Sequence, residues 1–218
     1  MYMVEDITIY EVREPEIAFP MDRDKFYDEQ IKTIKKTGKA DKIVEVVAVL
    51  LFNKDREIIL QKRSHHKIHN PFLIDKAIGG HITYGNSPGY TVMVETVQEL
   101  RVPSIVLRNE GDFKKTYKLL ETYLDNIAVI EELDHKIFEL ERVIGGEKYS
   151  MPHKVHLYIG VYGGATKAVD REASGVLNYG LDILKKEMDA QPQNFTGDLH
   201  FYLKRYEKEI KNFLQHFD

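Results

Sequence analysis

Two glutamates and a glutamine are spaced so that a single helix face would carry all three. Glu95, Gln98 and Glu99 stand at positions i, i+3 and i+4 of a predicted helix. Their side-chain oxygens could hold a hard divalent cation such as Mg²⁺ or Mn²⁺, which keeps several waters and bridges to substrate phosphates. The alternative is that Glu95 and Glu99 belong to an ordinary solvated helix face, because charged helix faces are common.

The helix that would carry these residues has signals at both ends. Ser87 can cap its first turn and Pro88 suits its first position, while Pro103 ends the helix after about Arg101. The pair Gly79-Gly80 precedes the helix, and glycine there would let the loop backbone pack tightly against it.

Residues 79–102 resemble the Nudix box, the strand–loop–helix signature of Nudix hydrolases. Some positions of that pattern match and others depart from it. The matching residues are Gly80, Glu95, Glu99 and Val102, and the departures are Asn86, Val94, Thr96, Gln98 and Arg101. Asn86 and Val94 replace an acid and a base together, so this pair leaves no uncompensated charge.

The flanking sequence strengthens the resemblance, which covers roughly 40–110 and 150–206. Gln61-Lys62-Arg63 follows an aliphatic stretch, and Gly79-Gly80-His81 follows later, as in many Nudix proteins. Residues 194–206 are similar to the tail of Nudix proteins grouped near isopentenyl diphosphate isomerase. The chain has no cysteine, so the essential Cys of that branch is missing and isomerase chemistry is not expected.

The resemblance implies an α/β (α+β) Nudix fold, in which a mixed sheet is sandwiched between helices. It divides the chain into an N-terminal strand–helix extension (1–40) and a Nudix domain (41–218). Apolar residues at 3/4 spacing also predict a helical insertion over about 112–144, ending at Gly145-Gly146. The insertion could pack on the domain, cap the substrate pocket or form the interface of a homodimer.

The resemblance also implies an activity, namely metal-dependent hydrolysis of a diphosphate linkage in a nucleoside-diphosphate-like or other organic diphosphate compound. By that resemblance, Glu95 and Glu99 are the candidate catalytic residues, and the metal is Mg²⁺ or Mn²⁺. The candidate metal ligands are Glu95, Gln98, Glu99 and Glu172, and the candidate substrate-binding residues are Lys62, Arg63, Gly79, Gly80 and His81.

A second reading of the same residues is a Nudix-fold module that binds a nucleotide or phosphorylated ligand with weak or no turnover. Gln98 removes one negative charge from the predicted metal site, which should weaken metal binding. For Lys62 and Arg63, the alternative is that they are ordinary charges at the end of a strand.

Composition limits the other classes of function. The chain has 218 residues, of which 31 are Lys or Arg and 35 are Asp or Glu, giving a net charge of −4. This balance does not favour a partner that is a nucleic acid polymer. We expect no signal peptide and no membrane association, because no apolar run approaches the length that a bilayer requires. Without cysteine, the chain suits the reducing cytoplasm.

Histidines supply further candidates. His65, His66 and His69 lie close together in a polar segment, which we interpret as a surface loop because no fourth metal ligand is evident. His153 and His156 are three residues apart in a predicted strand, so their side chains should point to opposite faces of the sheet.

Overall fold

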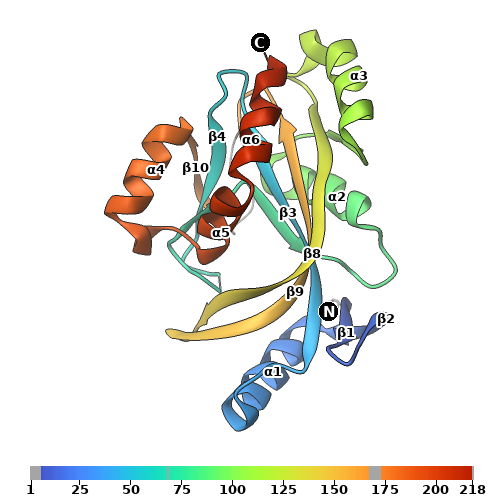
Figure 1. Ribbon diagram of the computed structural model, residues 1–218, viewed down its shortest axis with the longest axis vertical. Helices are drawn as coiled ribbons and strands as arrows, with labels where there is room; N and C mark the ends of the chain where they lie inside the picture. Colours follow the sequence, from blue (N-terminus) through green and yellow to red (C-terminus); the bar gives the residue numbers. More distant parts are fainter. Residues whose placement is uncertain (1–5, 68, 167–172, 218) are drawn as a thin grey trace.

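The computed structural model describes residues 6–67, 69–166 and 173–217 (Figure 1). Its strands are β1 (Asp6–Glu11), β2 (Glu14–Asp22), β3 (Lys42–Phe52), β4 (Ile58–Arg63), β5 (Ile74–Lys76), β6 (Ile78–His81), β7 (Ser104–Leu107), β8 (Ala128–Ile144), β9 (Glu147–Val161) and β10 (Ala173–Tyr179). Its α-helices are α1 (Arg23–Thr37), α2 (Pro88–Leu100), α3 (Glu110–Leu120), α4 (Leu181–Ala190), α5 (Gly197–Arg205) and α6 (Glu207–Leu214). Short 3₁₀ turns occur at Glu121–Tyr123, Pro192–Asn194 and Gln215–Phe217.

Strand β3 is the centre of the sheet. It is rich in β-branched residues, and every residue from Ile43 to Phe52 is buried. One edge of β3 pairs in parallel with β9, while the other edge pairs in turn with antiparallel β1, β6 and β4. The strand order along the main path is β10-β4-β3-β9-β8-β7. The sheet is therefore mixed, with β3 holding the N-terminal strands and the later hairpins together.

Helices cover both faces of this sheet (Figure 1). Alternate residues of β3 enter two apolar clusters, one shared with α1, α3, α4, α5 and α6, and the other with α2. This arrangement confirms the expected α+β class, a mixed sheet between helices. Among the described residues, no helix is both long enough and apolar enough to cross a membrane.

The ends of the first two helices follow their sequence signals. Asp22 caps α1 by accepting a hydrogen bond from the amide of Lys25 at 2.8 Å, and Gly38 ends the helix with a φ of 81°. Ser87 caps α2 in the same way, with Pro88 at its first position. These caps fix where each helix begins, and so they fix which of its side chains face the sheet.

The expected helical insertion over 112–144 is wrong for its second half. Residues 110–120 are helical, but Ala128–Ile144 forms β8, a long strand paired with β9. Gly145 and Gly146 make the hairpin turn, with φ values of 60° and 85°, instead of ending a helix. The apolar spacing of residues 128–144 fits the period of a helix as well as that of a strand. Pairing with β9 along the length of β8 favours the strand.

The N-terminal segment contains one more strand than expected. Pro15 and Pro20 lie in β2, and β2 pairs with β1. Proline is tolerated there because an edge strand does not need every amide for the sheet. Since β1 also pairs with β3, the segment is joined to the main sheet and places α1 beside it.

A buried group of five charges ties β4, β5, β8 and α5 together. Arg63 lies 3.2 Å from Asp75, Lys76 lies 3.4 Å from Asp75 and 3.7 Å from Asp198, and Arg142 lies 2.7 Å from Asp198. All five side chains are at most 14% exposed. Buried charges are tolerated only when they are paired in this way. We call these residues the buried charge cluster.

The protonation of the cluster follows from its neighbours. Burial alone would raise the pKa of Asp75, but Lys76, Arg63 and the hydroxyl of Thr196, 2.7 Å away, hold that pKa well below its usual range. Burial opposes the charge of Arg142, yet Asp198 keeps its pKa above the usual value. Asp75 and Arg142 therefore both remain charged near neutral pH.

We expect the Asp198→Asn substitution to lower the free energy of unfolding by about 3 kcal/mol, because it leaves Arg142 charged and buried without a carboxylate. Urea unfolding at pH 7 measures this loss. Glu141→Gln is the matched control, since Glu141 pairs at 2.8 Å with Lys148 on the surface and should change stability by less than about 1 kcal/mol. Equal effects of the two substitutions would contradict the prediction.

A buried carboxylate outside the buried charge cluster lies near α3. Glu131 of β8 is 5% exposed. Burial, together with the nearby charge of Glu110, raises its pKa to about 7, although Lys114 opposes the shift. The folded chain thus keeps a proton on Glu131 that the unfolded chain releases near pH 4.5. Its contribution to stability therefore falls as the pH rises from about 4.5 to about 7.

We expect Glu131→Gln to stabilise the fold by about 2 kcal/mol at pH 8, because the neutral amide removes the cost of burying a charge. The gain should shrink as the pH falls through 7 and vanish near pH 4.5. Thermal unfolding followed by circular dichroism across this range tests it. The exposed Glu121→Gln serves as control, and a gain that does not depend on pH would refute the explanation.

Candidate functional site

A cavity of about 620 Å³ opens on the sheet between α1, α2 and the buried charge cluster. Its floor includes the middle of β3 and the end of β6. The residues from the sequence analysis that line it are Arg63, Gly79, Gly80, His81, Glu95 and Gln98. The structure thus brings most of the predicted site residues to one cavity, from three separate elements, β4, β6 and α2. A cavity of this size is typical of small-molecule sites.

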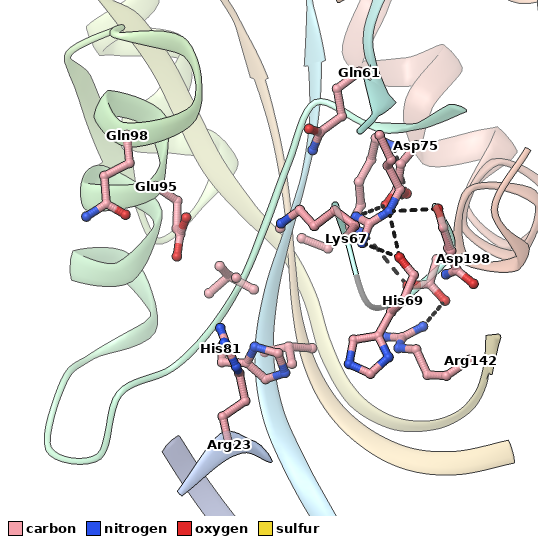
Figure 2. Close-up of a pocket in the computed structure, with 18 of the residues that line it drawn as sticks. Arg23, Gln61, Lys67, His69, Asp75, His81, Glu95, Gln98, Arg142 and Asp198 are labelled. Carbon is pink, nitrogen blue, oxygen red and sulfur yellow. Dashed lines mark hydrogen bonds and ion pairs between the residues drawn. The ribbon is translucent and has the colours of Figure 1, made fainter. Parts of the chain in front are cut away.

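One wall of the cavity is the acidic edge of α2. Figure 2 shows Glu95 and Gln98 on this helix, across the cavity from the buried charge cluster. A Cβ atom added to Gly80 would lie 2.2 Å from Oε1 of Glu95, so the carboxylate packs directly against the Gly80 backbone. Gly80 is therefore required for the position of Glu95, as the predicted tight packing of loop and helix indicated.

Two predicted site residues of the described chain, Glu99 and Lys62, do not line the cavity. Glu99 is 4% exposed and is not among the residues that line the cavity. Because each residue turns an α-helix by about 100°, Gln98 and Glu99 fall on opposite sides of Glu95, one toward solvent and one toward the sheet. Lys62 is exposed outside the cavity, and its carbonyl accepts a hydrogen bond from Ser174. Glu172 lies outside the described residues.

The opposite wall is the buried charge cluster, whose five members all line the cavity. Three cations and two carboxylates leave this wall with one net positive charge. Lys67 and His69 lie in front of it (Figure 2). The cavity is thus polarised, with a carboxylate at α2 and excess positive charge on the other side.

Neutral imidazoles lie between the two walls. Tyr27 of α1 shares a hydrogen bond of 2.8 Å with Nε2 of His81, and the ring centroid of His69 is 4.3 Å from that of Tyr27. Burial lowers the pKa of His69 to about 4, helped by Arg142 and Arg63. Burial and then Arg23 lower the pKa of His81 well below its usual value. Both imidazoles are therefore uncharged at neutral pH and can exchange hydrogen bonds with polar ligand groups.

The other histidines agree with the expectations for them, with one exception. His65 and His66 are exposed, as expected for a surface loop, but His66 and His69 also line the cavity. His153 contacts the carbonyl of Met151, whereas His156 contacts Glu45, so the two point to opposite faces as expected.

The residues present suit one mode of metal binding. Within the described ranges, no group of three or more His, Cys, Asp or Glu side chains could hold a metal ion by itself. Mg²⁺, however, is usually held by one or two carboxylates together with substrate phosphates and water. Glu95 at the Gly80 backbone and the amide of Gln98 offer oxygen donors of that kind. The site therefore fits an ion that arrives with, or is completed by, a phosphate ligand.

Sequence reasoning did not single out several lining residues, because they come from elements remote from the motif. These residues are Arg23, Asp24 and Tyr27 of α1, Lys67 and Asn70 of the loop between β4 and β5, Lys76 of β5, Arg142 of β8, and Asp198 and Tyr202 of α5. No local pattern marks them. The one available signal is that Asp75 and Asp198 belong to the segments noted as similar to Nudix proteins.

No protein-family model and no curated protein matches the sequence, but solved structures do resemble the fold. DR0079 from Deinococcus radiodurans superposes with a TM-score of 0.53 and 17% identity, over 74% of this chain and 82% of that one. A bifunctional NMN adenylyltransferase/ADP ribose pyrophosphatase from Francisella tularensis, complexed with AMP and a manganese ion, gives a TM-score of 0.50 and 13% identity over 86% of this chain.

The chain spans 47% of the Francisella protein, so it corresponds to about half of that bifunctional molecule. A NUDIX hydrolase from Nitrosomonas europaea superposes with a TM-score of 0.46 and 10% identity, over 77% of this chain and 90% of that one. Sequence identities this low support a shared fold and no shared activity. The chain has the Nudix fold, as the resemblance of residues 79–102 to the Nudix box predicted.

Proposed function

We propose that the chain is a metal-dependent hydrolase that cleaves the anhydride bond of a small organic diphosphate compound. The observation that carries the proposal is the polarised cavity, in which Glu95 faces a wall with excess positive charge. Phosphate oxygens would lie toward Arg63 and Lys76, and the diphosphate would be oriented by these fixed charges before reaction.

In this proposal Mg²⁺ or Mn²⁺ lies beside Glu95 and Gln98. A divalent cation there would offset the charge of the phosphate oxygens and favour attack by water. Glu95 is the residue we assign to the ion, and the Gly80 backbone keeps its carboxylate in place. Gln98 contributes an uncharged oxygen. Glu99 is buried in the same helix and does not contact the ion in this proposal.

A specific observation favours the second candidate function, a module that binds a phosphorylated ligand without turnover. Glu99 is buried away from the cavity, and Gln98 and Asn86 replace acids of the Nudix box. Fewer carboxylates at the α2 wall leave less charge to concentrate a metal ion. Binding to the cationic wall does not need that charge, so ligand binding would survive the loss of catalysis.

We expect the purified chain to release phosphate or a phosphorylated product from at least one compound in a panel of organic diphosphates with Mg²⁺ or Mn²⁺ present. Glu95→Gln should lower kcat/KM by about 100-fold, because it removes the charged oxygen nearest the reacting phosphates. Glu187→Gln on the exposed face of α4 is the matched control. Absence of turnover across the panel would contradict the hydrolase proposal and leave the binding module.

We also expect Gln98→Glu to tighten Mn²⁺ binding about tenfold, because it adds a carboxylate beside Glu95. Calorimetric titration of the chain with Mn²⁺ alone measures the change. The surface substitution Gln193→Glu alters the net charge equally and should leave the affinity unchanged. If both variants bind Mn²⁺ alike, the α2 wall is not the metal site.

A further inference from the structure

We propose that Gln61 of β4 is a ligand-binding residue whose side-chain amide donates a hydrogen bond to a phosphate oxygen lying against the buried charge cluster. The inference rests on the proposed function, which places the phosphate groups toward Arg63 and Lys76 in the same cavity. It goes further by giving an uncharged residue of the cavity lining a part in recognition.

The side chain of Gln61 is buried at the cavity without a hydrogen-bond partner in the described part of the chain. Gln61 is 4% exposed and lines the cavity, and its amide is directed into the cavity (Figure 2). A glutamine amide offers two N–H donors and an oxygen acceptor, and no residue among 6–67, 69–166 and 173–217 uses any of them. A buried amide in this state has lost its bonds to water without replacement, which calls for a partner from outside the chain.

The strands on either side of β4 show why this amide is left over. Gln61 lies opposite Asp75 of β5 and Val176 of β10. Residues in such positions are the nearest partners for its side chain, but Val176 is apolar. The carboxylate of Asp75 is already bound by Lys76 at 3.4 Å and by the hydroxyl of Thr196 at 2.7 Å. Neither neighbouring strand therefore supplies a free partner.

The next residue of β4 on the same face is also engaged. Arg63 follows Gln61 by two positions, so the two side chains project to the same side of the strand. The guanidinium of Arg63 donates to the carboxylate of Asp75 and to the carbonyls of His69 and Asn70. Gln61 thus lies beside the cationic wall without taking part in its ion pairs.

The charge of that wall decides which ligand group the amide would meet. The buried charge cluster has three cations and two carboxylates, so it favours an anionic oxygen of the ligand next to it. Phosphate oxygens accept hydrogen bonds, and the N–H groups of Gln61 can donate to them without adding charge. An amide at this position can therefore hold a phosphate group while the ion pairs stay intact.

Gln30 of α1 shows the contrasting case of a buried glutamine whose partners come from the protein. It is 0% exposed, its amide nitrogen donates to the carboxylate of Asp41 at 2.8 Å, and its amide oxygen accepts from the backbone of Asp41 and Lys42 at 3.1 and 3.2 Å. The two glutamines are a matched pair. Loss of the Gln30 amide should cost stability, whereas loss of the Gln61 amide should cost ligand affinity.

Calorimetric titration with methylenediphosphonate, in the absence of metal, tests the inference with a probe that has no anhydride bond. Gln61→Met should lower the affinity for this probe about tenfold, because it keeps the length of the side chain and removes its donors. Gln61→Glu should lower the affinity further, because a third carboxylate would cancel the excess positive charge of the wall. Gln193→Met, at an exposed position, should leave the affinity unchanged.

Urea unfolding of the ligand-free variants separates a role in binding from a role in the fold. Gln61→Met should leave the unfolding midpoint unchanged or raise it, because an amide without a partner contributes no hydrogen bond to the folded chain. Gln30→Met should lower the midpoint, because it removes three hydrogen bonds.

Three results would overturn the inference: no detectable binding of methylenediphosphonate by the unaltered chain, equal affinities of the unaltered chain and Gln61→Met, or a lower unfolding midpoint for Gln61→Met. Failure of the proposed hydrolysis is a separate result, since the probe cannot be hydrolysed at an anhydride. A chain that binds the probe through Gln61 but cleaves no diphosphate would refute the hydrolase and support this inference. A chain that cleaves diphosphates, and whose affinity for the probe does not change in Gln61→Met, would do the reverse.

Discussion

The cost of burying charge constrains this structure more than any other interaction. Arg63, Lys76 and Arg142 lie under the cavity with two carboxylates between them, and none of the five could be buried alone. The pairs of Asp198 with Lys76 and Arg142 join elements distant in sequence, so β5, the end of β8 and α5 must meet for the charges to be compensated. The apolar clusters give the sheet its stability, and the charges specify how the C-terminal half is placed on it.

The same constraint shapes the cavity. Because three cations share two carboxylates, the wall cannot be neutral, and a ligand phosphate would complete the compensation. Burial, helped by the charge of Arg142, lowers the pKa of the nearby His69 and His81 and keeps both uncharged, which leaves them as hydrogen-bonding groups rather than competing cations. On the other side, the carboxylate of Glu95 packs against the Gly80 backbone. A fold with one fixed acidic point and one fixed basic wall can orient a diphosphate between them.

The sequence was informative where a local pattern had a local cause. Ser87, Pro88 and the Gly79-Gly80 pair predicted α2 and its contact with the loop, because caps and glycine packing act over a few residues. The helix predicted over residues 128–144 was wrong, because their apolar spacing fits a helix and a strand equally. Whether they form a strand depends on a partner strand distant from the motif. Arg23, Tyr27 and Arg142 could not be found, because they reach the cavity through tertiary packing that no spacing records.

The departures from the Nudix box act in a consistent direction. Gln98 in place of an acid lowers the negative charge near Glu95, while the cationic wall opposite keeps its excess charge. Less of the phosphate charge would then be offset by a metal ion and more by arginine and lysine. Metal charge acts at the reacting phosphorus, whereas fixed cations hold the ligand in any state. Strong metal binding would therefore favour the hydrolase, and weak metal binding would favour the binding module. The strength of metal binding at Glu95, compared with anion binding at the opposite wall, decides between them.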